Sequence, residues 1–190
     1  MQGVTAAEAA RRILDSNGLS HIRIERVAGN LTDHFDPRNN VIRLSDSVYG
    51  SSSVGAIGVA AHEAGHAIQY DVGYFPIKIR AAMIPITNIG SSLAIPLAVM
   101  GLIFGYLWLV DLGILLFLAV VLFQLITLPV EFNASRRALR TLETDQMLNH
   151  TELAGARRVL SAAAMTYVAA LVVAVANLLR LLALRGRRND

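Results

Sequence analysis

Two histidines four residues apart, with a glutamate between them, are the residues of this chain best suited to chemistry. They form the stretch His62-Glu63-Ala64-Gly65-His66. On an α-helix, positions i and i+4 share one face, so both imidazoles can reach one metal ion. Glu63 directly follows the first ligand, where its carboxylate can reach a water on the metal rather than the metal itself. Zinc hydrolysis needs these groups: two neutral nitrogen ligands, an open coordination position and a base for the water.

Two histidines do not complete a catalytic zinc site, which needs a third protein ligand. The candidates are carboxylates that return to the motif helix and the other histidines of the chain, His21, His34 and His150. Glu131 stands out because it ends a long and nearly uncharged run. A helix leaving a membrane at this point would place Glu131 at the water interface, where a motif helix docked on the membrane could meet it. It is equally consistent with the sequence that Glu131 only marks the end of a transmembrane helix and binds no metal.

The apolar composition indicates an integral membrane protein. Hydrophobic residues make up 54% of the chain and charged residues 16%, against about 25% charged in a soluble domain. Residues 92–130 are uncharged except for Asp111 and predict a transmembrane hairpin that turns at 111–113. Residues 159–184 predict a C-terminal transmembrane helix whose direction the sequence leaves open. A chain of 190 residues could hardly bury three such runs in a soluble core.

The segments before the hairpin predict a small α+β body. Thr5 to Glu8 has the pattern of a capping box and begins a helix that ends near Asn17 and Gly18. Alternating apolar residues predict strands over 21–27 and 41–44, and the serines at 51–53 can cap the motif helix, which ends near 70–73.

The expected fold class is therefore α+β: a mainly helical membrane protein with a small antiparallel sheet beside a zincin-like helix. We expect a single domain over 1–190. Its parts are a soluble part with the zinc motif (1–80), the hairpin (92–130), a helix with the third ligand and a basic segment (131–158), and the last helix (159–184).

The charged residues narrow the function further. The chain has no cysteine, which excludes disulfides and cysteine-ligated metals, and it carries 17 basic and 14 acidic residues. Many of the arginines flank the apolar runs, where lipid phosphate is a better partner than nucleic acid. The hairpin tip near Asp111 carries no positive charge, whereas its other ends are flanked by Lys78, Arg80, Arg136, Arg137 and Arg140. The positive-inside rule then places the metal site at the cytoplasmic face of the cell membrane.

Three separated motifs resemble one family. Residues 33–38 (Asp-His-Phe-Asp-Pro-Arg), 58–67 around the two histidines, and 128–135 (Leu-Pro-Val-Glu-Phe-Asn-Ala-Ser) are similar to the YugP-like membrane zinc metallopeptidases of bacteria. The likeness covers nearly the whole chain, including residues 162–169. The third motif also resembles the Glu-x-x-x-Asp element of the HtpX-type and CAAX-prenyl membrane proteases, whose glutamate is the third zinc ligand. Ser135 stands at the place of that aspartate, which is a departure from the pattern.

The resemblance implies a zinc-dependent hydrolase that cleaves peptide bonds at the membrane. It implies that His62, His66 and Glu131 hold Zn²⁺ and that Glu63 is the catalytic base. Peptide or protein substrates and the lipid bilayer are the expected partners, nucleic acid is not, and the oligomeric state stays open. Members of the family usually begin with a further hydrophobic helix, which this sequence lacks, so we expect either a shortened chain or a naturally short member.

Several roles are left as alternatives by the sequence. Each ligand histidine needs an acceptor for its other ring nitrogen, for which Asn133 and Ser135 are candidates. An oxyanion donor could be His34, Arg136, Arg137 or Tyr167. The segment from Leu31 to His34 is expected to be an edge strand that pairs with an extended peptide. The alternative functions are an inactive zinc-binding scaffold or chaperone partner, and a transporter whose path the histidines line.

Overall fold

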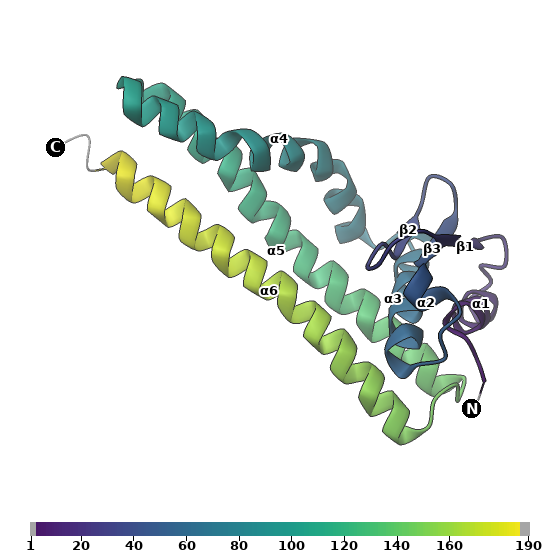
Figure 1. Cartoon of the computed structure of the whole chain (residues 1–190). Helices are drawn as coiled ribbons and strands as arrows, with labels where there is room; N and C mark the ends of the chain where they lie inside the picture. Colours follow the sequence, from purple (N-terminus) through teal and green to yellow (C-terminus); the bar gives the residue numbers. More distant parts are fainter. Residues whose placement is uncertain (1–2, 187–190) are drawn as a thin grey trace. The chain divides into compact units, whose positions relative to one another are not determined.

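The computed structural model describes residues 3–186 and divides into two compact units (Figure 1). Unit 1 consists of Met1–Tyr74 and Val130–Ala164, and unit 2 of Phe75–Pro129 and Met165–Asp190. Each unit has a hydrophobic core of its own. The three residues proposed as metal ligands all belong to unit 1.

Unit 1 begins with helix α1 (Ala6–Ser16), which has the predicted capping box. The Thr5 hydroxyl accepts a hydrogen bond from the Glu8 amide at 3.3 Å, and the Glu8 carboxylate accepts one from the Thr5 amide at 2.8 Å. These two bonds satisfy amide groups that a helix start otherwise leaves without partners. The apolar face of α1 is buried in the core of unit 1, where α1 lies against helix α3 (Val54–Asp71).

The sheet of unit 1 has the strand order β1-β3-β2. Its strands are β1 (Arg23–Val27), β2 (His34–Asp36) and β3 (Val41–Ser45). The α+β fold class is confirmed, but the sheet is mixed rather than antiparallel as expected. Strand β2 runs antiparallel to β3, whereas β1 runs parallel to it. The chain reverses once before β2 and once after it, and these two reversals restore the direction of β1.

The edge strand lies slightly later in the chain than expected. The prediction placed it at Leu31 to His34, but Leu31 has a φ of 57° and is 95% exposed. A residue in this left-handed conformation cannot continue a strand. The strand therefore begins at His34 and ends at Asp36, and it forms one edge of the sheet.

Helix α3 carries the metal motif and lies deep in unit 1. It follows the short helix α2 (Asp46–Tyr49), and the Ser53 hydroxyl caps it by accepting from the Ala56 amide at 3.2 Å. The glycines of α3 differ in how closely a neighbouring helix approaches them. A Cβ built on Gly65 would lie 2.5 Å from the carbonyl oxygen of Ala134, whereas one on Gly58 would lie 3.8 Å from the Cβ of Ala156. Only glycine at position 65 allows this approach of the two backbones.

Within residues 3–186, three helices are long and apolar enough to cross a membrane. They are α4 (Phe75–Phe104), α5 (Leu107–Thr144) and α6 (His150–Gly186). In unit 2 they leave large apolar side chains exposed, among them Ile103, Trp108, Leu115 and Val172, each more than 60% exposed. A surface of this kind suits lipid and not water.

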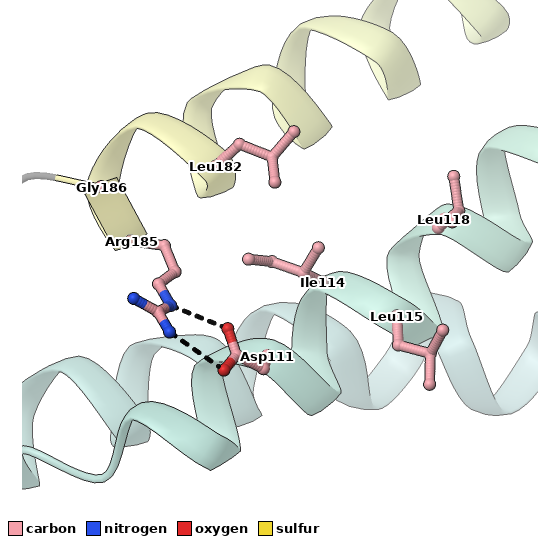
Figure 2. A pocket seen from close by; sticks show the side chains of 7 residues that line it. All are labelled: Asp111, Ile114, Leu115, Leu118, Leu182, Arg185 and Gly186. Carbon is pink, nitrogen blue, oxygen red and sulfur yellow. Dashed lines mark hydrogen bonds and ion pairs between the residues drawn. The ribbon is translucent and has the colours of Figure 1, made fainter. Parts of the chain in front are cut away.

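The turn of the hairpin is not where the sequence suggested. We expected it at 111–113, but α4 ends at Phe104 and α5 begins at Leu107, with Gly105 between them at a φ of 80°. Asp111 lies inside α5 and forms an ion pair with Arg185 near the end of α6, at 2.8 and 3.3 Å (Figure 2). The ion pair explains how the apolar helix α5 can contain the charged residue Asp111. It also shows that α5 and α6 run in opposite directions within unit 2.

The contact at Gly65 leads to a first prediction. Alanine in place of either helical glycine should gain up to about 1 kcal/mol from backbone entropy. Gly65→Ala must also push back the Ala134 backbone, and overpacking of this kind costs roughly 1–3 kcal/mol. We therefore expect Gly65→Ala to lower the midpoint of thermal unfolding, followed by circular dichroism in detergent. Gly58→Ala, the matched control, should leave the midpoint unchanged or raise it, and equal midpoints would contradict the packing argument.

Candidate metal centre

The three proposed ligands come together in unit 1. His62 and His66 lie one turn apart on α3, with ring centroids 4.7 Å apart and ring planes at 82°. Glu131, on α5, is 2% exposed, and its Oε2 lies 3.0 Å from Nε2 of His62 and 3.6 Å from Nε2 of His66. One ligand atom from each of the three residues lies within 4.8 Å of the others. Among residues 3–186, the other histidines are not part of this group.

The chemistry of this donor set fits zinc. Two imidazole nitrogens and one carboxylate oxygen are a ligand set that catalytic zinc sites use, with one position left for water or substrate. Burial of the His66 ring lowers its pKa, but the contact with Glu131 and the nearby charge of Glu63 raise that pKa more, so it lies above the usual value. The negative charge that raises this pKa also favours a bound cation. These three residues can therefore hold one metal ion.

Ser135 contacts the His62 ring at the nitrogen that does not face Glu131. Nδ1 of His62 lies 3.1 Å from the Ser135 hydroxyl, while its Nε2 faces Glu131. A histidine that binds metal through Nε2 must carry its proton on Nδ1 and donate it to an acceptor. Serine can accept this hydrogen bond, so position 135 contacts a ligand although it lacks the carboxylate of the related motif. Of the two acceptors that the sequence suggested, Ser135 is the one that touches a ligand histidine directly.

The ring of His66 is held by Gln69, which the sequence reasoning missed. Nδ1 of His66 lies 2.9 Å from Oε1 of Gln69, whose side chain is fully buried. The Gln69 amide nitrogen donates to the carbonyl oxygen of Val130 at 2.8 Å and to Oδ1 of Asn133 at 3.0 Å. Gln69 is three residues beyond His66 on the same helix face, and this spacing was a signal that could have identified it.

The hydrogen bonds around Gln69 determine that Nδ1 of His66 carries a proton. Nε of Arg137 can only donate, so the atom of Asn133 that it contacts at 2.8 Å must be the oxygen. The carbonyl of Val130 can only accept, so the NH₂ group of Gln69 faces it. The Gln69 oxygen is then left for His66, which must donate from Nδ1. The chain of bonds from Arg137 to His66 therefore places a proton on Nδ1, so that Nε2 is the ring nitrogen that can bind a metal.

The proposed base lies between α3 and the edge strand. Glu63 is 9% exposed, and its Oε2 accepts a hydrogen bond from the backbone amide of Phe35 at 2.9 Å. Because this amide points to Glu63, it lies on the edge of β2 that does not pair with β3. The Phe35 ring makes an edge contact with Tyr70 at the end of α3, with centroids 5.6 Å apart. Strand β2 is thus fixed to the motif helix by one hydrogen bond and one ring contact.

The candidate oxyanion donors lie in different environments. His34 donates from Nδ1 to the carbonyl of Thr32 at 2.7 Å, so its ring is turned toward its own loop. Arg137 is used in the chain of bonds behind His66, and Arg136 lines a separate cavity of unit 1. Tyr167 belongs to unit 2. Within residues 3–186, His34 is not among the residues grouped at the metal centre.

The role of Gln69 leads to a second prediction. Gln69→Leu keeps the size of the side chain but removes the acceptor behind His66. Loss of such a partner typically costs 10–100-fold in metal affinity. We expect the zinc dissociation constant, measured by competition with a chromophoric chelator, to rise by about that factor. Gln124→Leu makes the same chemical change in unit 2 and should leave zinc affinity unchanged. Equal affinities of the two variants would show that Gln69 does not position the ligand.

Comparison with known proteins relates the chain to a family of zinc metallopeptidases. The profile of the family described as "Putative neutral zinc metallopeptidase" matches residues 1–186. The "Putative membrane protease YugP" of Bacillus subtilis (strain 168) is 49% identical over 190 residues, which cover 99% of this chain and 84% of the relative. No solved structure matches the chain. A profile match over almost the whole length, together with this identity, shows that the chain belongs to the neutral zinc metallopeptidase family and is a membrane protein of that family.

Proposed function

We propose that this protein is a zinc-dependent endopeptidase of the membrane. The observation that supports this most is the position of Glu63. It lies on the same helix as two of the three metal-binding residues, and its carboxylate is held at the free edge of a strand. A site that only stores or senses metal has no need of a buried carboxylate next to its ligands. A hydrolase needs one as a base.

The residues of the site divide the work of peptide hydrolysis. His62, His66 and Glu131 hold zinc, which when bound supplies a Lewis acid for the peptide carbonyl and makes water reactive near neutral pH. Glu63 takes a proton from the attacking water on its carboxylate and later gives it to the leaving nitrogen. Ser135 and Gln69 accept the Nδ1 protons of the two histidines, so that Nε2 is the ring nitrogen of each that is turned to the metal.

The free edge of β2 is the place where we expect a peptide substrate. An extended peptide that adds to a sheet edge is bound through its main chain, largely without regard to its side chains. The outward amide of Phe35 is the donor that such a peptide would meet, and that amide now bonds to Glu63. A substrate carbonyl that takes over the Phe35 amide would release the Glu63 carboxylate for its role as base. Substrate binding would then activate Glu63 as the base in the same step.

The role of Glu63 is tested by an amide in place of the carboxylate. Glu63→Gln preserves shape but cannot accept a proton, so casein or peptide cleavage by the purified protein should fall by about 10²–10⁴-fold. Zinc content should stay at the wild-type level, whereas Glu131→Ala should lose zinc and activity together. Asp71→Asn makes the same kind of change at the end of α3 and should retain both. Full cleavage by Glu63→Gln would refute the proposed base, and no cleavage by the wild type would favour the scaffold alternative.

We further propose that the metal site faces the cytoplasm. Arginines 136, 137, 140, 157 and 158 belong to the unit that holds the site, and Lys78 and Arg80 follow that unit closely in sequence. Together they outnumber the basic residues near the hairpin turn. The ion pair with Asp111 brings Arg185 to the turn end, and Arg187 and Arg188 follow it in sequence. The charge difference is thus smaller than the hairpin alone suggests. It still favours the metal site at the inside.

Single cysteines test this orientation, because the chain has none of its own. Ser52 is exposed in unit 1, and Tyr106, 56% exposed, lies in the hairpin turn. In intact bacterial cells that express each variant, a membrane-impermeant maleimide should label Tyr106→Cys and spare Ser52→Cys. Permeabilised cells, the control, should label both. The reverse pattern would place the metal site outside.

A further inference from the structure

A second cavity of unit 1 carries charge that the metal chemistry does not use. It has a volume of about 420 Å³ and lies between the end of α5 and the start of α6. Arg136 and Arg140 line it from α5, and Arg157 lines it from α6. All three side chains are exposed, and within residues 3–186 none of them has a hydrogen bond or ion pair. Glu143 is the carboxylate among the lining residues, so two positive charges remain in excess.

The rest of the cavity wall is largely apolar. Phe132, Leu139 and Leu160 lie beside the three arginines. A small inorganic anion would use the guanidinium groups but not this apolar surface. A ligand that joins an anionic group to hydrocarbon would use both, as arginines beside membrane helices do when they bind acidic lipid headgroups.

The position of the arginines along the helices agrees with such a ligand. Arg157 comes two residues before the uncharged run of α6, and Arg136 comes six residues after Val130, the last residue of the uncharged run of α5. Six residues of α-helix rise about 9 Å. The polar layer of a bilayer is about 5–8 Å thick on each side of its hydrocarbon core. Long arginine side chains at these positions reach the depth of lipid phosphates.

The cavity also lies on the Nδ1 side of the His62 ring, where a peptide could not be cleaved. Ser135 is part of its wall, and the Ser135 hydroxyl contacts Nδ1 of the His62 ring. The metal-binding nitrogen of that ring is Nε2, which faces Glu131. A ligand in the cavity therefore approaches His62 from behind, whereas a scissile peptide must approach on the Nε2 side.

We propose that this cavity binds the headgroup of an anionic phospholipid. Arg136, Arg140 and Arg157 hold the phosphate, and the apolar wall receives the first part of an acyl chain. The site goes beyond the proposed hydrolysis and does not require it, because lipid binding depends on neither zinc nor Glu63. It places a lipid beside Ser135, which supports a metal ligand.

Native mass spectrometry of the full-length protein, released from detergent with added lipid, tests the site. Phosphatidylglycerol and phosphatidylcholine share the phosphate but differ in net charge. The wild type should retain one phosphatidylglycerol about ten-fold more tightly than phosphatidylcholine. Arg140→Gln with Arg157→Gln, one change on each helix, should lose most of that preference. Ser161→Trp fills the cavity without changing its charge and should weaken phosphatidylglycerol binding as well.

The matched control removes two arginines elsewhere. Arg38 and Arg158 are exposed and do not line the cavity, so Arg38→Gln with Arg158→Gln should keep the preference. Equal losses in the two double variants would mean diffuse attraction to charge and overturn the proposal. So would equal binding of the two lipids by the wild type. A third contrary result is unchanged lipid binding in the cavity variant together with a raised KM for a glutamate-rich peptide, which would make the cavity a substrate subsite.

Discussion

The closeness of α3 and α5 at Gly65 and Ala134 is the constraint on which the site depends. A Cβ at position 65 would meet the Ala134 carbonyl at 2.5 Å, so the two backbones are nearer than any side chain allows. Glu131 and Ser135 lie on either side of Ala134 in the chain, and His62 and His66 lie on either side of Gly65. One close contact therefore brings Glu131 and Ser135 within hydrogen-bond distance of His62, and it brings Oε2 of Glu131 to 3.6 Å from Nε2 of His66.

Burial makes the orientation of the ligands strict. Gln69 and Glu131 are almost fully enclosed, and a buried polar group without a partner is costly. The bonds that join Arg137, Asn133, Gln69 and His66 allow a single arrangement of donors and acceptors. The surroundings of His66 thus place a proton on Nδ1 and leave Nε2 as the nitrogen for a metal. Chemistry at Nε2 is prepared by contacts made at Nδ1, on the far side of each ring.

Charge is handled differently in the two units. In unit 2, the single acidic residue of the hairpin is paired with Arg185, which allows α5 to carry it among apolar residues (Figure 2). In unit 1, Arg136, Arg140 and Arg157 line a cavity with an apolar wall and have no side-chain partner among residues 3–186. The first arrangement serves the packing of helices. The second leaves charge available to a partner outside the chain.

The sequence alone determined the features that depend on residues close together in the chain. The spacing of His62 and His66 follows from the helix period, the capping box at Thr5 from local hydrogen bonds, and the long apolar helices from their composition. Resemblance to a family added the expectation for Glu131. Tertiary structure decided which distant groups meet: Gln69 with Val130, the Phe35 amide with Glu63, Arg185 with Asp111, and β1 beside β3 in parallel. Such contacts depend on how helices and strands pack, and no periodicity within a single segment records that packing.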